Sequence, residues 1–177
     1  IDLSNYTIER FSNGANTSAS GGVTYLNGII LPGDVFVITN GDTATSSSYG
    51  YIDPILYALG DFAEPNGSYP TPLHFNGNDA IALMKNGTLI DVIGRIGEDP
   101  GQAWTDNSLY GYISGNVGAL NPGTWYTANH TLIRKYNITN GDNIGADLFD
   151  PSLEWDSLPS NTWLYLGYHA CDCQNAT

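Results

Sequence analysis

Residues 75–94, with the sequence FNGNDAIALMKNGTLIDVIG, constrain the fold more than any other stretch of this chain. Apolar residues dominate two runs, 80–84 and 89–93, and Asn86-Gly87 lies between them. Asn and Gly both tolerate the positive φ angles of a type I′ turn, so this pattern predicts a β-hairpin. Neither face of the second run is clearly polar, which indicates an inner strand pair that is buried on most of its area.

Further short strands are predicted on both sides of this hairpin. They cover residues 3–11, 25–30, 35–39 and 131–136, and a last apolar run occupies residues 163–169. One short helix is predicted near residues 53–60, because Asp53 can cap it and Pro54 fits its first position. Seven or eight short strands with one small helix favour an all-β fold, specifically a β-sandwich.

The composition is that of an acidic globular domain. The 177 residues suffice for one domain, and 18 acidic against 5 basic residues give a net charge of −13. Such a surface repels nucleic-acid phosphate and anionic membranes, so no nucleic-acid partner is expected. The acidity is typical of a soluble secreted protein and also suits divalent cations. No apolar run reaches the length of a membrane span.

The two cysteines, Cys171 and Cys173, are separated by a single residue. Three states are open to them: a strained bridge between the two, separate bonds to residues outside this chain, or free thiols. A zinc site is disfavoured, because tetrahedral zinc takes four ligands and His169 is the one other soft donor nearby.

Motifs for catalysis are missing from the sequence. It contains no G-x-S-x-G, P-loop, H-E-x-x-H or C-x-x-C pattern. The three histidines, His74, His130 and His169, are distant from one another in sequence, and scattered histidines at strand ends are usually solvated or capping residues. The chain is therefore predicted not to be an enzyme.

Residues 140–150, NGDNIGADLFD, form the best metal-binding candidate. Calcium prefers several oxygen ligands, which one loop can supply here from Asn140, Asp142, Asn143 and Asp147. The spacing does not match an EF-hand, since the closing Glu is missing. The alternative is a polar turn in which these side chains cap their own backbone.

Seven asparagines begin an N-x-S/T pattern, more than the content of Asn, Ser and Thr gives by chance. This excess suits a glycosylated surface protein, although a turn-rich composition explains it equally well. Asn86 is a poor acceptor because it occupies the predicted tight turn. The remaining glycosylation candidates are Asn5, Asn16, Asn66, Asn129, Asn137 and Asn175.

A series of motifs extends over nearly the whole sequence: LSNYTI at 3–8, LNG at 26–28, LPGDVFVI at 31–38, FNGNDAIAL at 75–83, IDVIG at 90–94, GEDPG at 97–101 with Trp104, TLIRK at 131–135, FDP at 149–151, EW at 154–155 and LGYH at 166–169. In the order of these motifs the chain resembles the lamin tail domain in its bacterial extracellular form. The resemblance implies an immunoglobulin-like β-sandwich over residues 1–169, with residues 170–177 as a C-terminal extension.

The resemblance also implies a non-catalytic module of secreted proteins. Members of the family usually carry one or two strands before the LSNYTI segment, so those strands of the sandwich are expected to be absent here. The sheet edge beside residues 3–11 is then open, for an upstream segment or for a strand from a protein partner or a second copy. The leading hypothesis is a secreted, non-enzymatic module for cell-surface attachment or extracellular, strand-complemented assembly. The alternative is an accessory domain of a secreted nuclease or phosphatase that binds substrate or calcium.

Overall fold

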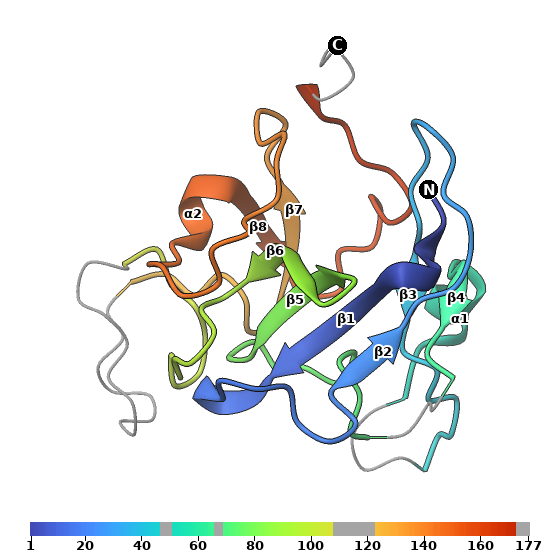
Figure 1. Ribbon diagram of the computed structural model, residues 1–177, viewed down its shortest axis with the longest axis horizontal. Coiled ribbons are helices and arrows are strands. Elements are labelled where there is room, and N and C mark those ends of the chain that lie inside the picture. The colour runs from blue at the N-terminus through green and yellow to red at the C-terminus, as the bar shows by residue number, and fades with distance from the viewer. Residues whose placement is uncertain (47–50, 66–68, 108–122, 173–177) are drawn as a thin grey trace.

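A four-stranded antiparallel sheet is the centre of the fold (Figure 1). The structure, a computed structural model, describes residues 1–46, 51–65, 69–107 and 123–172. The strands of this sheet lie in the order β2-β1-β5-β6. Their bounds are Tyr6–Phe11 for β1, Val23–Tyr25 for β2, Ala80–Lys85 for β5 and Thr88–Ile93 for β6.

The predicted hairpin is confirmed as β5 and β6, joined by Asn86-Gly87. Both turn residues have positive φ, 50° for Asn86 and 75° for Gly87, as a type I′ turn requires. The expectation of an inner strand pair is right for β5 alone, because β6 is the last strand of the sheet. Residues of the 140–145 loop cover that edge instead, with the Asp142 amide donating to the Asp91 carboxylate at 2.9 Å.

Apolar side chains on one face of the sheet form the core. Phe11, Ala80, Ala82 and Val92 are buried there, and partly buried Met84, Leu89 and Ile96 pack against them. Phe11 of β1 is paired with Ala80 of β5, and successive side chains of a strand point to opposite faces of the sheet. This alternation leaves Ile8 and Leu83, which are also paired, on the opposite face.

The expected open edge beside residues 3–11 is wrong. Strand β1 pairs with β5 along its whole length and with β2 on its other side. The pairing with residues 22–30 continues upstream, since the Leu3 amide donates to the Gly28 carbonyl at 3.0 Å and Asp2 bridges Ile29. The backbone groups of β1 are therefore occupied by this chain, and no strand can add there.

A small parallel pair lies on the β2 side of the sheet (Figure 1). It consists of β3, Ile38–Thr39, and β4, Phe62–Ala63, so the strand predicted over 35–39 is shorter than expected. The helix α1, Pro54–Ala58, precedes β4 and is also shorter than the predicted 53–60. Its predicted start is confirmed, because the Asp53 carboxylate accepts the Ile55 amide and Pro54 occupies the first turn.

A second two-stranded sheet lies on the β6 side. Strand β7, His130–Arg134, pairs antiparallel with β8, Trp155–Pro159, and the short helix α2, Pro151–Glu154, leads into β8. Two 3-10 turns, Leu3–Asn5 and Ser12–Gly14, flank β1. The described chain is thus mostly strand with few short helices, which confirms the all-β class, whereas its arrangement as a β-sandwich stays a prediction.

Candidate functional site

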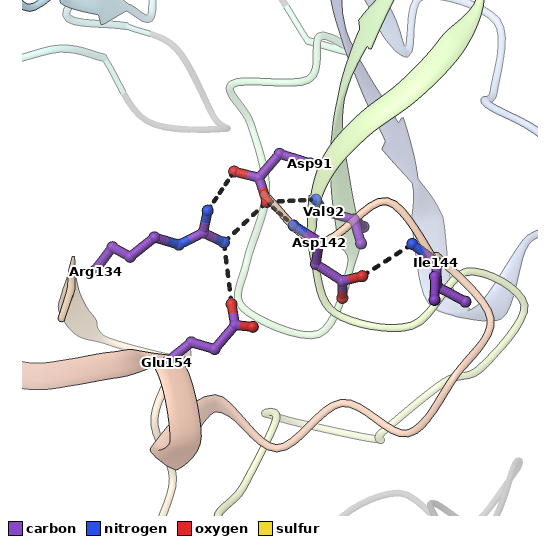
Figure 2. Close-up of polar contacts among 6 residues, drawn as sticks. All are labelled: Asp91, Val92, Arg134, Asp142, Ile144 and Glu154. Carbon is purple, nitrogen blue, oxygen red and sulfur yellow. Dashed lines mark hydrogen bonds and ion pairs between the residues drawn. The ribbon is translucent and has the colours of Figure 1, made fainter. Parts of the chain in front are cut away.

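Arg134 joins three separate segments through its guanidinium group (Figure 2). Its Nη1 lies 2.7 Å from Asp91 Oδ2, and its Nη2 lies 2.9 Å from Asp91 Oδ1 and 3.2 Å from Glu154 Oε2. The pair with Asp91 is bidentate, the geometry in which Arg and carboxylate bind most strongly. The guanidinium carbon also lies 4.4 Å from the ring centroid of Trp155. Strands β6, β7 and β8 are therefore fixed together at this point.

The Asp91 carboxylate has further partners that orient it. Its Oδ1 accepts the amide of Val92 at 3.0 Å and that of Asp142 at 2.9 Å (Figure 2). The side chain of Arg134 is 12% exposed, against 28% for Asp91 and 33% for Glu154, so the cluster is only partly screened by water. These contacts pair the Arg134 guanidinium with two carboxylates, while its buried Nε has no hydrogen-bond partner in the described part of the chain, and the cluster holds the β6–β7 junction together.

The predicted calcium ligands lie beside this cluster, in the loop after β7. Asp142 Oδ1 accepts the Ile144 amide at 2.9 Å, and the Asn140 amide donates to Thr139 at 3.3 Å (Figure 2 draws the former). These are the local self-capping contacts of the alternative interpretation. Among the described residues no group of three or more His, Cys, Asp or Glu side chains is arranged to hold a metal. Calcium binding by Asn140, Asp142, Asn143 and Asp147 stays a prediction.

Folding stability is expected to be higher near pH 4 than near pH 5.5. Burial is the main cause that raises the pKa of Asp79, Asp142 and Glu154 above ordinary values of 3.8, 3.8 and 4.5. A carboxyl group with a raised pKa binds its proton more tightly in the folded chain. The free energy of unfolding therefore falls as the pH rises from the ordinary value through the raised one.

Urea denaturation midpoints of the full chain at pH 4 and pH 5.5 measure this difference. The variant Asp142→Asn removes one of the three groups, so its two midpoints are expected to lie closer together than those of the parent chain. A parent midpoint that is equal at the two pH values, or higher at pH 5.5, contradicts the expectation.

An apolar groove of about 760 Å³ crosses the sheet face opposite the core. Its floor includes Ile8 and Leu83 from the face identified above, with Ile90 of β6 beside them. Its wall is formed by residues 33–38, and His169 and Cys171 complete the lining. Ile8 and Leu83 are only half-buried, whereas Ala80, Ala82 and Val92 on the core face are fully buried. This sheet face therefore presents apolar side chains that the described chain does not cover.

Apolar exposure continues around this groove. Ile1 lines the groove and is 69% exposed, and Ile29 and Leu31, the chain neighbours of the lining residue Ile30, are 62% and 64% exposed. Monomeric proteins rarely leave large connected apolar patches in water. The groove and its rim are therefore the strongest candidate for a protein-binding surface on the described part of the chain.

The other residues singled out in the sequence are scattered over the structure. Cys171 is disulfide-bonded, and Cys173 lies outside the described residues. Asn66 and Asn175 also lie outside them, whereas Asn5, Asn16, Asn129 and Asn137 are exposed. Glycosylation at these positions stays a prediction.

Two buried arginines were not recognised from the sequence as organising residues. Arg10 lies on β1 next to Phe11, and Arg134 lies on β7 next to Ile133. A usable signal was present: the chain has only 5 basic residues, and a cation inside an apolar strand needs a buried acidic partner. Asp79 is such a partner for Arg10, and its carboxylate also accepts the Asn13 amide at 3.2 Å.

Comparison with known proteins gives no relative. No family model matches this chain, and no curated protein or solved structure is significantly similar to it. The resemblance to the lamin tail domain therefore remains a prediction from the residues that carry it. None of the helices in the described ranges has the length and apolar character needed to cross a membrane.

Proposed function

We propose that this chain is a secreted, non-enzymatic β module that serves in cell-surface attachment or extracellular assembly, by docking a second copy into the apolar groove. The groove of about 760 Å³ across the free sheet face carries this proposal. The lamin-tail resemblance agrees with it, because that family consists of non-catalytic modules of secreted proteins. The docking surface is the sheet face and not the edge of β1, which β2 and β5 occupy.

Hydrophobic burial drives this association. Each square ångström of apolar surface removed from water stabilises a complex by roughly 25 cal/mol, so burial of the groove lining and its rim favours docking. The exposed apolar residues at the rim, Ile1, Ile29 and Leu31, extend the surface that a second copy covers. A partner copy also carries the net charge of −13, so the two copies repel each other at long range. Association is therefore expected to strengthen with added salt, which screens that repulsion.

The substitution Leu83→Asp is expected to weaken self-association at least tenfold. It places a charge on the groove floor, and a charge buried without a partner opposes docking. Sedimentation velocity over a concentration series of the full chain measures the dissociation constant. Because Leu83 also belongs to β5, a urea melt of the variant shows whether it is still folded; Phe36→Asp, in the groove wall, gives a second substitution away from the central sheet.

The matched control is Ile55→Asp, on the exposed face of α1 and 68% exposed. It introduces the same charge outside the groove and is expected to leave the dissociation constant unchanged. A chain that stays monomeric at every concentration and salt level contradicts the proposal, as does an equal loss of association in Ile55→Asp.

A calcium-binding accessory role is the second candidate. It rests on the predicted ligands Asp142 and Asp147, which line a cleft of about 380 Å³ together with Asp150 and Glu154, although the described acidic side chains are not arranged as a group that holds a metal. Calcium that raises the melting temperature of the parent chain, but not that of Asp142→Asn with Asp147→Asn, favours this role.

A further inference from the structure

A second cleft, of about 480 Å³, lies at the far end of β1 from the apolar groove. Segments distant in sequence converge on it: the end of β1 supplies Arg10, and the loops before β5 supply Tyr69, His74, Phe75 and Asp79. The volume falls within the roughly 300–1,000 Å³ of small-molecule sites. Below we refer to it as the Arg10 cleft.

Aromatic side chains border the Arg10 cleft while remaining exposed. Tyr51 is 50% exposed, Tyr69 is 45% exposed and Phe75 is 55% exposed. The Phe75 ring has no polar atom that gains from contact with water, so this exposure costs free energy unless a ligand covers the ring. Three rings around one cleft supply flat apolar surfaces on which the C–H face of a ring-shaped ligand can lie.

Polar groups at the base of the cleft are held in fixed positions. Arg10 is 4% exposed, and its Nη1 donates to the His74 carbonyl at 2.6 Å and lies 3.7 Å from Asp79 Oδ2. Its guanidinium carbon lies 5.5 Å from the Tyr69 ring centroid. Its Nε has no hydrogen-bond partner. The His74 ring is held from both sides, with Nδ1 at 2.8 Å from Thr71 Oγ1 and Nε2 at 3.2 Å from the Asn40 amide nitrogen.

The charges of the Arg10 cleft nearly cancel. Arg10 and Asp79 face each other, and burial lowers the pKa of His74, which favours the neutral ring near pH 7. The chain as a whole carries −13, which disfavours a polyanionic ligand. Asn13, Asn40 and Asn76 also line the cleft, and although the amides of Asn13 and Asn40 already bond within the chain, an amide has further donor and acceptor capacity. These properties of the cleft favour an uncharged ligand that has several hydroxyl groups and apolar faces.

We infer that the Arg10 cleft binds a neutral saccharide, whose C–H faces lie on Tyr69 and Phe75 and whose hydroxyls bond to the amide and guanidinium groups at its base. This inference deepens the proposed attachment role by naming the chemical class of the attached surface, and it rests on that role for its biological setting. The Arg10 cleft is separate from the apolar groove, so experiments can disprove saccharide binding or self-association independently of each other.

Isothermal titration of the full chain with neutral oligosaccharides tests the inference. Gluco-, manno-, xylo- and N-acetylglucosamine oligomers of three to six units are the probes, after an array screen. At least one is expected to bind, and Phe75→Ala is expected to weaken it about tenfold or more through loss of the stacked ring. The matched control Tyr136→Ala removes a 57% exposed aromatic that does not line the cleft, and is expected to bind as the parent does.

Phe75 is more than half exposed, so its replacement is expected to leave the melting temperature unchanged, and a thermal melt verifies this. Absence of binding to every neutral oligosaccharide at millimolar concentration overturns the inference, as does binding that survives Phe75→Ala. Binding that is retained in Leu83→Asp, while self-association is lost, supports the saccharide site independently of the groove. Self-association without any saccharide binding leaves the proposed assembly intact and overturns the inference alone.

Discussion

Replacing Trp104 by alanine is expected to lower the free energy of unfolding by about 3–5 kcal/mol, the usual cost of deleting a buried aromatic ring. Trp104 is fully buried, and its ring meets that of Phe149 edge-on at a centroid distance of 5.5 Å. Its Nε1 also donates to the Asp79 carbonyl at 3.2 Å. Only a glycine fits at position 94, because a Cβ there would lie 2.9 Å from the indole ring. Urea denaturation of the purified variant measures the loss.

The matched control is Trp163→Ala, which removes the same ring from a position that is 38% exposed. The expected loss is below about 1.5 kcal/mol, because much of that ring is already in contact with water. Equal losses for the two variants would show that Trp104 is not at the centre of the packing.

Replacing Arg134 by methionine is expected to lower the free energy of unfolding by about 2–3 kcal/mol. The substitution removes the guanidinium group and leaves the carboxylates of Asp91 and Glu154 side by side without a cation. Breaking a fully buried ion pair costs roughly 3–5 kcal/mol, and partial exposure of the two acids reduces that penalty. The free energy of unfolding from urea titration measures it, and the loss is expected to shrink at pH 4, where the acids are more protonated.

Arg95→Met serves as the comparison for Arg134. Arg95 pairs with Glu98 three residues away and donates to the Ala146 carbonyl at 2.8 Å, but its side chain is 32% exposed and therefore better solvated than that of Arg134. A loss below about 1 kcal/mol is expected. A loss from Arg95→Met as large as that from Arg134→Met would contradict the role assigned to the Arg134 cluster.

The elements that could be predicted from sequence are those fixed by neighbouring residues. The β5–β6 hairpin depends on Asn86-Gly87, and α1 depends on Asp53 and Pro54, each within a few residues of the element it starts or joins. Local turn and cap chemistry specifies such elements before any tertiary contact forms. This is why the hairpin is predicted correctly, whereas the pairing of β1 with β2 is not.

The features that could not be predicted depend on contacts between distant residues. Strand β2 covers the edge of β1, for example by pairing Thr24 with Ile8. Because β2 is only 3 residues long, its sequence pattern does not indicate this pairing. The strand expected at 35–39 pairs with another strand only at Ile38 and Thr39, whereas Val35 and Phe36 line the apolar groove. The Arg134 cluster likewise joins residues 43 and 20 positions apart, a distance over which sequence spacing carries no signal.

Assembly through the apolar groove is expected to depend on other contacts than assembly through an open strand edge. An open edge would recruit a strand through backbone hydrogen bonds, and those are tolerant of sequence. The groove instead offers side chains, so its partner must match it in shape and apolar character. Substitutions in the groove are therefore expected to separate assembly from folding more cleanly than substitutions in β1.

Hydrogen–deuterium exchange at two concentrations of the full chain, one below and one above the association midpoint, tests this account most directly. Docking at the groove is expected to slow exchange of amides in residues 33–38 and 26–31 at the higher concentration, with no change around α1. The account is contradicted if exchange is the same at both concentrations, or if the slowed amides lie away from the groove.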